Sequence, residues 1–211
     1  MDDRQGRVPF EYALKNFSRR DPSEIEKRLH VPYDADKNEF EIHIMGEKYK
    51  VSWPDGIIRD QSGDVVDSYV IGILVLRFLG NGVHVPLEEK CITYKEIPDG
   101  QIYYPNFKKR TLDKLAEKFQ ENKDLFRFAD PNKFRKTKTG DDGREFMIVD
   151  HVPMTFICWL GDDEFGPEAN ILFDQNISNY FNAEDLAVLP DLGIAYFSNG
   201  CKLPTSFGMY D

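Results

Sequence analysis

The chain has 211 residues, of which 41% are hydrophobic and 13% aromatic, and it carries a net charge of −10. Such a chain buries about 70% of its unfolded surface when it folds, and its composition excludes an intrinsically disordered protein. The negative charge disfavours duplex nucleic acid as a partner, because phosphate binding needs a basic surface.

The predicted elements begin with two short helices within residues 1–30. The first covers residues 10–17. The second starts after Asp21, which can cap it, with Pro22 in the first turn and Glu24 completing a capping box. This helix should end near His30, before the next proline.

A β-hairpin of residues 39–45 and 48–53 is the clearest element. Apolar and polar residues alternate along both segments, and Gly46-Glu47 supplies a two-residue turn. Pairing across this turn predicts three apolar pairs on one face: Ile44 with Tyr49, Ile42 with Val51, and Phe40 with Trp53.

The middle of the chain is predicted to mix helices and strands. Residues 64–79 favour a helix capped by Asp64, although their valine and isoleucine content also fits a strand. Strands are predicted at 92–97 and 102–104, joined by a turn at 98–100. An amphipathic helix at 111–121 then carries an apolar stripe formed by Leu112, Leu115, Ala116 and Phe119.

The last third is predicted to hold a hairpin of 134–138 with 144–150, a buried strand at 154–160 and a short strand at 171–173. Asn182 caps a final helix that Pro190 should kink or split.

The order of these elements lacks a regular βαβ alternation. It therefore predicts an α+β fold with a mixed, largely antiparallel sheet and several helices, in a single domain over residues 1–211. Residues 1–30 form its N-terminal helical segment, and residues 150–211 its acidic C-terminal segment.

The apolar segments and the cysteine spacing indicate where the protein is located and whether it holds a metal. The apolar run at 69–76 is far shorter than the roughly 20 residues that cross a bilayer, and no apolar signal segment follows Met1. We therefore expect a cytoplasmic protein. Cys91, Cys158 and Cys201 are widely spaced, which argues against a disulfide framework or a self-contained iron–sulfur or zinc site.

Charge is distributed unevenly along the chain. Residues 108–138 contain eleven Lys and Arg against five Asp and Glu, whereas residues 150–211 contain ten Asp and Glu against the single Lys202. An acidic segment beside a basic one indicates recognition through charge.

The densest acidic cluster is the candidate site. Asp162, Asp163, Glu164 and Glu168 fall within seven residues, directly after the predicted strand at 154–160. Such a loop can contact a partner, bind magnesium or calcium, or supply an acid and a base if burial separates the pKa values of its carboxyl groups. It can also be simply a solvated loop.

Three of the four histidines stand in the tripeptide His-Val-Pro, at 30–32, 84–86 and 151–153. A three-histidine metal site is conceivable, but each proline favours an extended conformation at an element end. We therefore expect that the three segments do not form one metal site.

Residues 156–174, Tyr180 and residues 182–189 resemble a family known as a domain of unknown function, as do residues 94–100 and Phe107. The resemblance implies occurrence in anaerobic bacteria and archaea, with some relatives fused to an iron–sulfur module like that of corrinoid iron–sulfur proteins. Trp159, Phe165, Asp174 and Tyr180 belong to this stretch and join the loop carboxylates as candidate binding residues.

Three hypotheses follow. The first is an accessory binding protein of anaerobic metabolism whose acidic C-terminal third recognises a redox, corrinoid or other tetrapyrrole-bearing partner or ligand, such as an iron–sulfur or corrinoid protein. The second is a small enzyme using the 162–168 carboxylates with a metal, or with an apolar pocket of Trp159, Phe165 and Phe173. The third is a structural protein that forms homo-oligomers through its basic and acidic segments.

Overall fold

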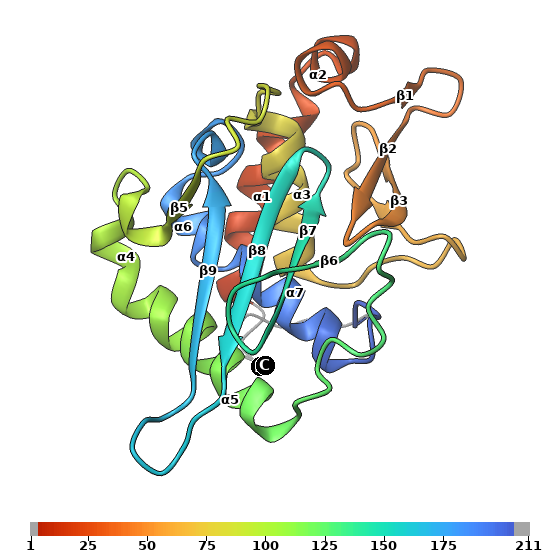
Figure 1. Cartoon of the computed structure of the whole chain (residues 1–211). Coiled ribbons are helices and arrows are strands. Elements are labelled where there is room, and N and C mark those ends of the chain that lie inside the picture. Colours follow the sequence, from red (N-terminus) through yellow and green to blue (C-terminus); the bar gives the residue numbers. More distant parts are fainter. Residues whose placement is uncertain (1–3, 205–211) are drawn as a thin grey trace. The chain divides into compact units, whose positions relative to one another are not determined.

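The computed structural model describes residues 4–204, and contacts within the chain group it into two compact units (Figure 1). The first unit comprises residues up to Val85 together with 179–181. The second unit comprises residues 86–178 and 182–204. Helices and antiparallel strands are mixed without βαβ alternation, so the predicted α+β class is confirmed. The single domain stays a prediction.

Three helices belong to the first unit: α1 (Arg4–Ser18), α2 (Pro22–Leu29) and α3 (Tyr69–Asn81). The side chain of Asp21 accepts hydrogen bonds from the backbone N–H groups of Ser23 (2.8 Å) and Glu24 (3.2 Å), which confirms the predicted cap of α2. α2 ends where His30 adopts a left-handed conformation with φ of 55°.

Helix α3 begins later than predicted. Its cap is Ser68, whose hydroxyl accepts from the N–H of Ile71 at 3.3 Å, and not Asp64. The helix is apolar on every side and almost wholly buried, as expected for a core helix. At its far end the guanidinium of Arg28 donates to the carbonyl of Leu79 at 2.7 Å, so α2 caps the C-terminus of α3.

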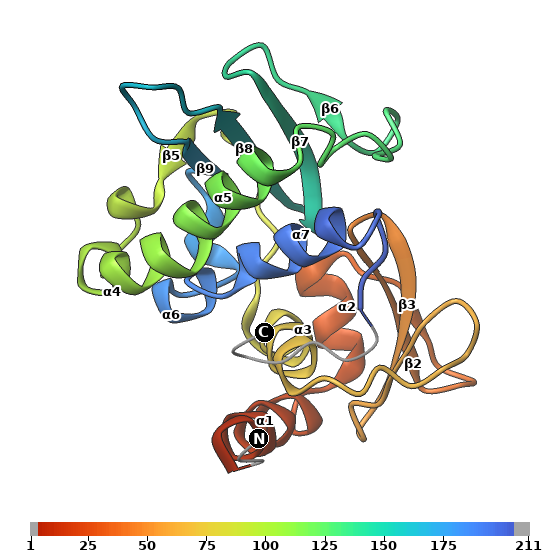
Figure 2. The same ribbon diagram turned by 90° about the horizontal axis from the view of Figure 1, so that it is seen from below.

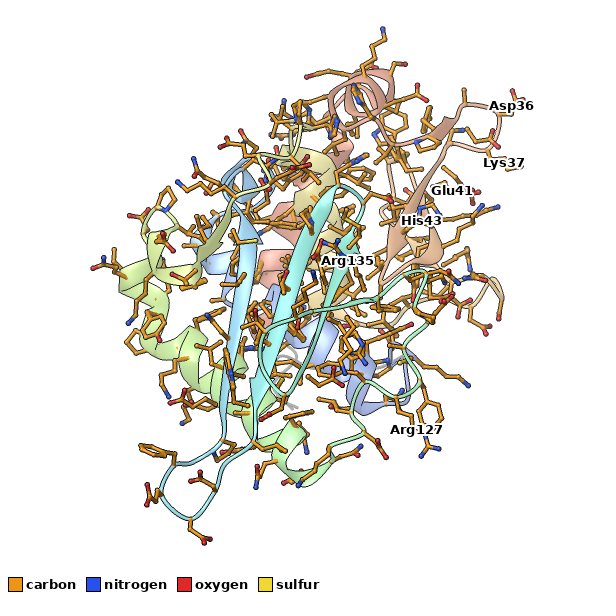
Figure 3. All side chains as sticks on the ribbon, viewed as in Figure 1. Asp36, Lys37, Glu41, His43, Arg127 and Arg135 are labelled. Atoms are coloured by element: carbon orange, nitrogen blue, oxygen red, sulfur yellow. The ribbon has the colours of Figure 1, made fainter. Side chains whose placement is uncertain are left out.

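The strands of the first unit lie in the order β4 (Ile58–Arg59), β3 (Glu47–Ser52), β2 (Glu39–Ile44) and β1 (Tyr33–Asp34). Figure 3 labels Glu41 and His43, which alternate along β2 with fully buried residues. Phe40 is one of these buried residues, and its ring packs edge-on against Phe17 of α1 at 5.9 Å between centroids. This contact joins sheet and helix in one core.

The predicted register of the β2–β3 hairpin is wrong by two residues. Phe40 pairs with Val51, Ile42 with Tyr49, and Ile44 with Glu47. The turn is therefore Met45-Gly46, whose φ angles of 52° and 74° match the turn type that follows the twist of a hairpin. A two-residue shift keeps every side chain on its own face, so Ile42 and Val51 both remain buried as predicted.

The sheet of the second unit has the order β7 (Asp142–Val149), β8 (Val152–Trp159), β9 (Glu168–Asp174) and β5 (Cys91–Thr93), and β6 (Arg135–Lys136) pairs with β7. All these pairs are antiparallel. The predicted 134–138 with 144–150 hairpin and the strands near 154–160 and 171–173 are thus confirmed.

Helices of the second unit cover one face of this sheet (Figures 1 and 2). They are α4 (Gly100–Phe107), α5 (Asp113–Glu121), α6 (Ala183–Leu186) and α7 (Leu189–Ser198), with 3₁₀ turns at Tyr94–Glu96 and Ile177–Asn179. The covered face carries Phe146 and Phe156, whose rings meet edge-on at 5.1 Å. Gly193 allows α7 to approach Phe156 closely, since a Cβ at this position would lie 2.8 Å from the Phe156 ring.

Two strand predictions in this unit need correction. β5 stops at Thr93, and the strand predicted at 102–104 is instead part of helix α4. The ring of Tyr94 stacks on that of Phe107 at 3.9 Å between centroids, and helical geometry brings Phe107 there. Tertiary packing therefore overrides the strand preference of isoleucine and tyrosine.

The predicted final helix is capped and split as expected. The side chain of Asn182 accepts from the N–H of Asp185 at 2.9 Å and caps α6. Pro190 stands in the first turn of the separate helix α7.

A π-helical turn, Lys108–Leu112, joins α4 to α5, with the N–H of Asp113 donating to the carbonyl of Lys108. This turn carries Arg110, whose guanidinium pairs with the carboxylate of Asp191 in α7. Asp191 is 2% exposed, and the ammonium of Lys114 lies 3.7 Å from its other oxygen. Burial raises the pKa of Asp191, against the opposing pull of Arg110 and Lys114.

This buried pair should contribute to stability. We expect Asp191→Ala to lower the free energy of unfolding by about 3 kcal/mol, because it leaves the largely buried Arg110 without its counter-charge. Asp113→Ala is the matched control: it removes a pair with Lys108 whose side chains are 44% and 51% exposed, and should cost less than about 1 kcal/mol. Urea unfolding measures the free energy of unfolding of both variants. Equal losses would show that Asp191 contributes no more to stability than the exposed Asp113.

Candidate functional site

Six of the eight predicted binding residues gather at one end of the β8–β9 hairpin. Trp159 and Glu168 form the last cross-strand pair of the hairpin, and Asp162, Asp163, Glu164 and Phe165 lie in the loop that joins the strands. This loop projects past the ends of the strands (Figure 1). Asp174 lies at the opposite end of β9, about 20 Å away at the rise of a strand. Tyr180 belongs to the first unit.

Asp162 has a structural part in this loop. Its carboxylate accepts from the N–H groups of Phe165 and Glu164, both at 2.8 Å, and its own N–H donates to the carbonyl of Phe165 at 2.8 Å. These backbone donors hold the pKa of Asp162 below its ordinary value. Asp162 therefore shapes the turn.

The base of the loop is anchored to its surroundings. The N–H of Leu160 donates to the carboxylate of Asp141 at 2.7 Å, and the N–H of Gly161 donates to the side-chain oxygen of Gln120 in α5 at 3.0 Å. A Cβ at Gly161 would lie 2.7 Å from the backbone nitrogen of Pro167, so only glycine fits. The loop is thus held from both sides at its base.

The tip exposes an aromatic ring among carboxylates. Asp163, Glu164 and Phe165 are all exposed, and 71% of the surface of Phe165 is accessible. A ring in water gains nothing from the fold, whereas burying it against another molecule would be worth about 1.5–3 kcal/mol. The tip therefore presents apolar surface that the fold does not bury.

Asp174 is a structural residue of the second unit. It is 7% exposed, and it accepts hydrogen bonds from the N–H groups of Glu88 (3.2 Å), Glu89 (3.0 Å) and Asn176 (3.0 Å). These bonds fasten the segment before β5 to the end of β9. Two of these partners, Glu88 and Glu89, lie about 85 residues back in the sequence, which is why a local motif did not reveal the structural role of Asp174.

Tyr180 is likewise held inside its own unit. It is 3% exposed, its ring stacks on Phe78 at 6.1 Å, and its hydroxyl donates to the carbonyl of Val85 and accepts from the Val85 N–H, both at 3.3 Å. The hydroxyl also lies 3.2 Å from Nδ1 of His84.

The open face of the second unit's sheet contains a groove that sequence reasoning missed. Its volume is about 390 Å³, within the range of small ligand pockets. Pro153, Thr155 and Leu172 form its floor, between Glu89 and Asp174 on one side and the ion pair of Arg135 with Glu145 on the other. The outward positions of β7, β8 and β9 give the only signal: Glu145, Thr155 and Leu172 are neighbours across three strands.

Cys91 also lines this groove and is exposed. Burial, followed by the nearby charges of Glu145 and Asp174, raises the pKa of its thiol. A raised pKa keeps the thiol protonated at neutral pH, which is unfavourable for a nucleophile.

The family model for the domain of unknown function DUF3786 matches residues 21–196. The chain belongs to this family. No curated protein and no solved structure was found to match it.

The DUF3786 match spans the hairpin loop, the groove and the buried ion pair. It confirms the resemblance to a domain of unknown function. The features that the resemblance implied beyond this, anaerobic hosts and fusion to a corrinoid-type iron–sulfur module, stay predictions.

The three residues of the predicted apolar pocket do not meet in this DUF3786 domain. Phe165 is at the loop tip and Trp159 is half-buried beside it, whereas Phe173 is buried with its ring 6.4 Å from that of Phe107. Asp163 and Glu164 are both exposed at the loop tip.

Of the three His-Val-Pro segments, two lie together. The rings of His30 and His84 are 4.5 Å apart in the first unit, and His151 occupies the turn between β7 and β8 in the second. Among residues 4–204, no group of three or more His, Cys, Asp or Glu is spaced to hold a metal ion. None of the helices in that range is long and apolar enough to cross a membrane.

The division between structural and contact carboxylates can be tested by stability. Asp174→Ala should lower the free energy of unfolding by about 2–3 kcal/mol, because three backbone N–H groups lose a charged acceptor. Asp163→Ala, on the same hairpin, should leave it nearly unchanged. Chemical denaturation followed by circular dichroism measures both, and a loss at Asp163 as large as at Asp174 would show that the loop tip is structural.

Proposed function

We propose that this protein is a cytoplasmic accessory binding protein that recognises a protein partner through the tip of its β8–β9 hairpin. The observation that carries the proposal is the accessible ring of Phe165, presented beside Asp163 and Glu164 on an anchored loop. Aromatic residues surrounded by polar ones are the usual energetic centre of protein interfaces.

The chemistry of the tip defines the partner surface. An aromatic ring requires an apolar pocket, and neighbouring carboxylates favour a basic rim around it. The anchored base supports binding without a large ordering cost, since the loop keeps its shape through the bonds of Asp162. Exposed charges act over about 8 Å at physiological ionic strength, so recognition should weaken as salt rises.

The partner class that we propose is a redox protein carrying a corrinoid, another tetrapyrrole or an iron–sulfur cluster. Its support is the resemblance to relatives that carry such a module. The hairpin itself supports a basic protein surface with an apolar pocket and does not depend on the cofactor.

The hypothesis of self-association through the basic segment has less support from the charges. Arg110 and Lys114 face Asp191, Lys108 pairs with Asp113, and Arg135 pairs with Glu145. Much of the basic segment is therefore already neutralised within the second unit, which favours a different protein as the partner.

The hairpin can be tested with two phenylalanines of equal exposure. Phe165 and Phe128 are each 71% accessible, so Phe165→Ser and Phe128→Ser remove the same apolar surface at different places. We expect Phe165→Ser to reduce capture of the partner from anaerobic lysate at least tenfold and Phe128→Ser to leave it unchanged. Quantitative mass spectrometry of the captured proteins, at low and high salt, is the measurement.

A further variant tests the charges while keeping the turn. Asp163→Lys combined with Glu164→Lys retains Asp162, so the loop keeps its bonds, and capture should be lost. Unaltered melting temperatures are the control for folding. Equal capture by all variants at every salt concentration would contradict the proposed function.

A further inference from the structure

The open-face groove of the second unit has a charge pattern of its own. Two carboxylates, Glu89 and Asp174, line one side. The other side is formed by Glu145 and Arg135, which pair across β7 and β6. Figure 3 shows Arg135 over the strands of this sheet. Arg135 is paired with Glu145 and Asp174 accepts three backbone N–H groups, so the exposed Glu89 is the carboxylate of the groove that a ligand can reach.

The floor of the groove is largely apolar and follows the strands. Thr155 of β8 and Leu172 of β9 are cross-strand partners, and Pro153 lies two residues before Thr155 on β8. All three are half-buried. Leu87, at the rim, is 43% exposed. A ligand lying here would therefore cover apolar surface and place a positive group against the carboxylate side.

The carboxylate side is fixed in position. Two of the three N–H groups that Asp174 accepts, those of Glu88 and Glu89, belong to the rim segment itself. Glu89 has φ of 53°, a backbone conformation that non-glycine residues rarely adopt. The rim is thus held in one shape by bonds to β9, and the Glu89 side chain is presented from a constrained backbone.

We infer that this groove is a second docking surface, which takes a basic segment of the partner protein: an arginine or lysine against Glu89 and Asp174, with an apolar neighbour on Leu172 and Pro153. The inference rests on the proposed function, since it extends the partner contact from the hairpin tip along the same strands. Charge complementarity selects the occupant, because the exposed carboxylate of Glu89 faces the groove and an acidic segment would be repelled by it.

A short peptide tests the groove without the partner. The probe is arginine–leucine–arginine, acetylated and amidated, added to the full-length isotopically labelled protein and followed by amide chemical shifts. We expect saturable shifts at Cys91, Thr155 and Leu172, with no change at Phe165 in the loop. The peptide glutamate–leucine–glutamate should cause none of them.

Neighbouring glutamates provide a matched pair of variants. Glu89→Gln removes a charge from the groove, whereas Glu88→Gln removes one from an adjacent residue that does not line it. Loss of one exposed ion pair should weaken peptide binding about two- to fivefold for Glu89→Gln only. Asp163→Asn, in the hairpin loop, should have no effect on the peptide.

Three results would overturn the inference. The first two are binding of the acidic peptide as tightly as the basic one, and an affinity of Glu89→Gln for the basic peptide equal to that of the unaltered protein. The third is binding of the small cation agmatine as tightly as the basic peptide, which would make the groove a small-molecule site. If the peptide does not bind but Phe165→Ser loses capture of the partner, the groove inference fails and the proposed hairpin function stands. The reverse result, peptide binding with normal capture by Phe165→Ser, would refute the hairpin function alone.

Discussion

The antiparallel hydrogen bonding between β8 and β9 is the constraint on which both the acidic loop and the groove depend. It runs from Met154 opposite Phe173 to Trp159 opposite Glu168, and it places the loop at one end and the groove at the other. Because side chains alternate between the faces of a strand, the same pairing that buries Phe156 and Ile171 against the helices turns Thr155 and Leu172 outward. The core and the groove therefore lie on two faces of one hairpin.

The helices beneath this hairpin are joined by a charged contact in an otherwise apolar layer. Phe146, Phe156 and Phe197 meet there edge-on, which would allow several packings of similar energy. Arg110 of the π-helical turn and Lys114 of α5 both meet Asp191 of α7, so charged contacts link these segments. Removing one partner would leave a buried charge without its counter-charge, which costs more free energy than the intact pair gains.

The sequence predicted correctly those helix ends that depend only on neighbouring residues. The side-chain caps at Asp21 and Asn182 and the split at Pro190 follow from hydrogen bonds and sterics within a few residues, and all three are confirmed. The hairpin register failed because Met45 takes a left-handed conformation that sequence does not announce. Residues 102–104 form a helix because distant rings pack on it.

The site followed the same division. The loop carboxylates and Phe165 are adjacent in sequence, so their grouping and their exposure were predictable, and their contact role stays a prediction. Asp174 and Tyr180 bond to residues more than 80 positions away, and the groove is assembled from five strands and the segment before β5. No local pattern can reveal such a set.

The π-helical turn at Lys108–Leu112 makes α4 and α5 a helix with one surplus residue. Each residue of a helix turns it by about 100°, so the surplus resets the angular phase between the two halves. It lets Phe107 meet Tyr94 while Arg110 faces Asp191. A helix lacking that one residue would be smoother and would lose one of these two alignments.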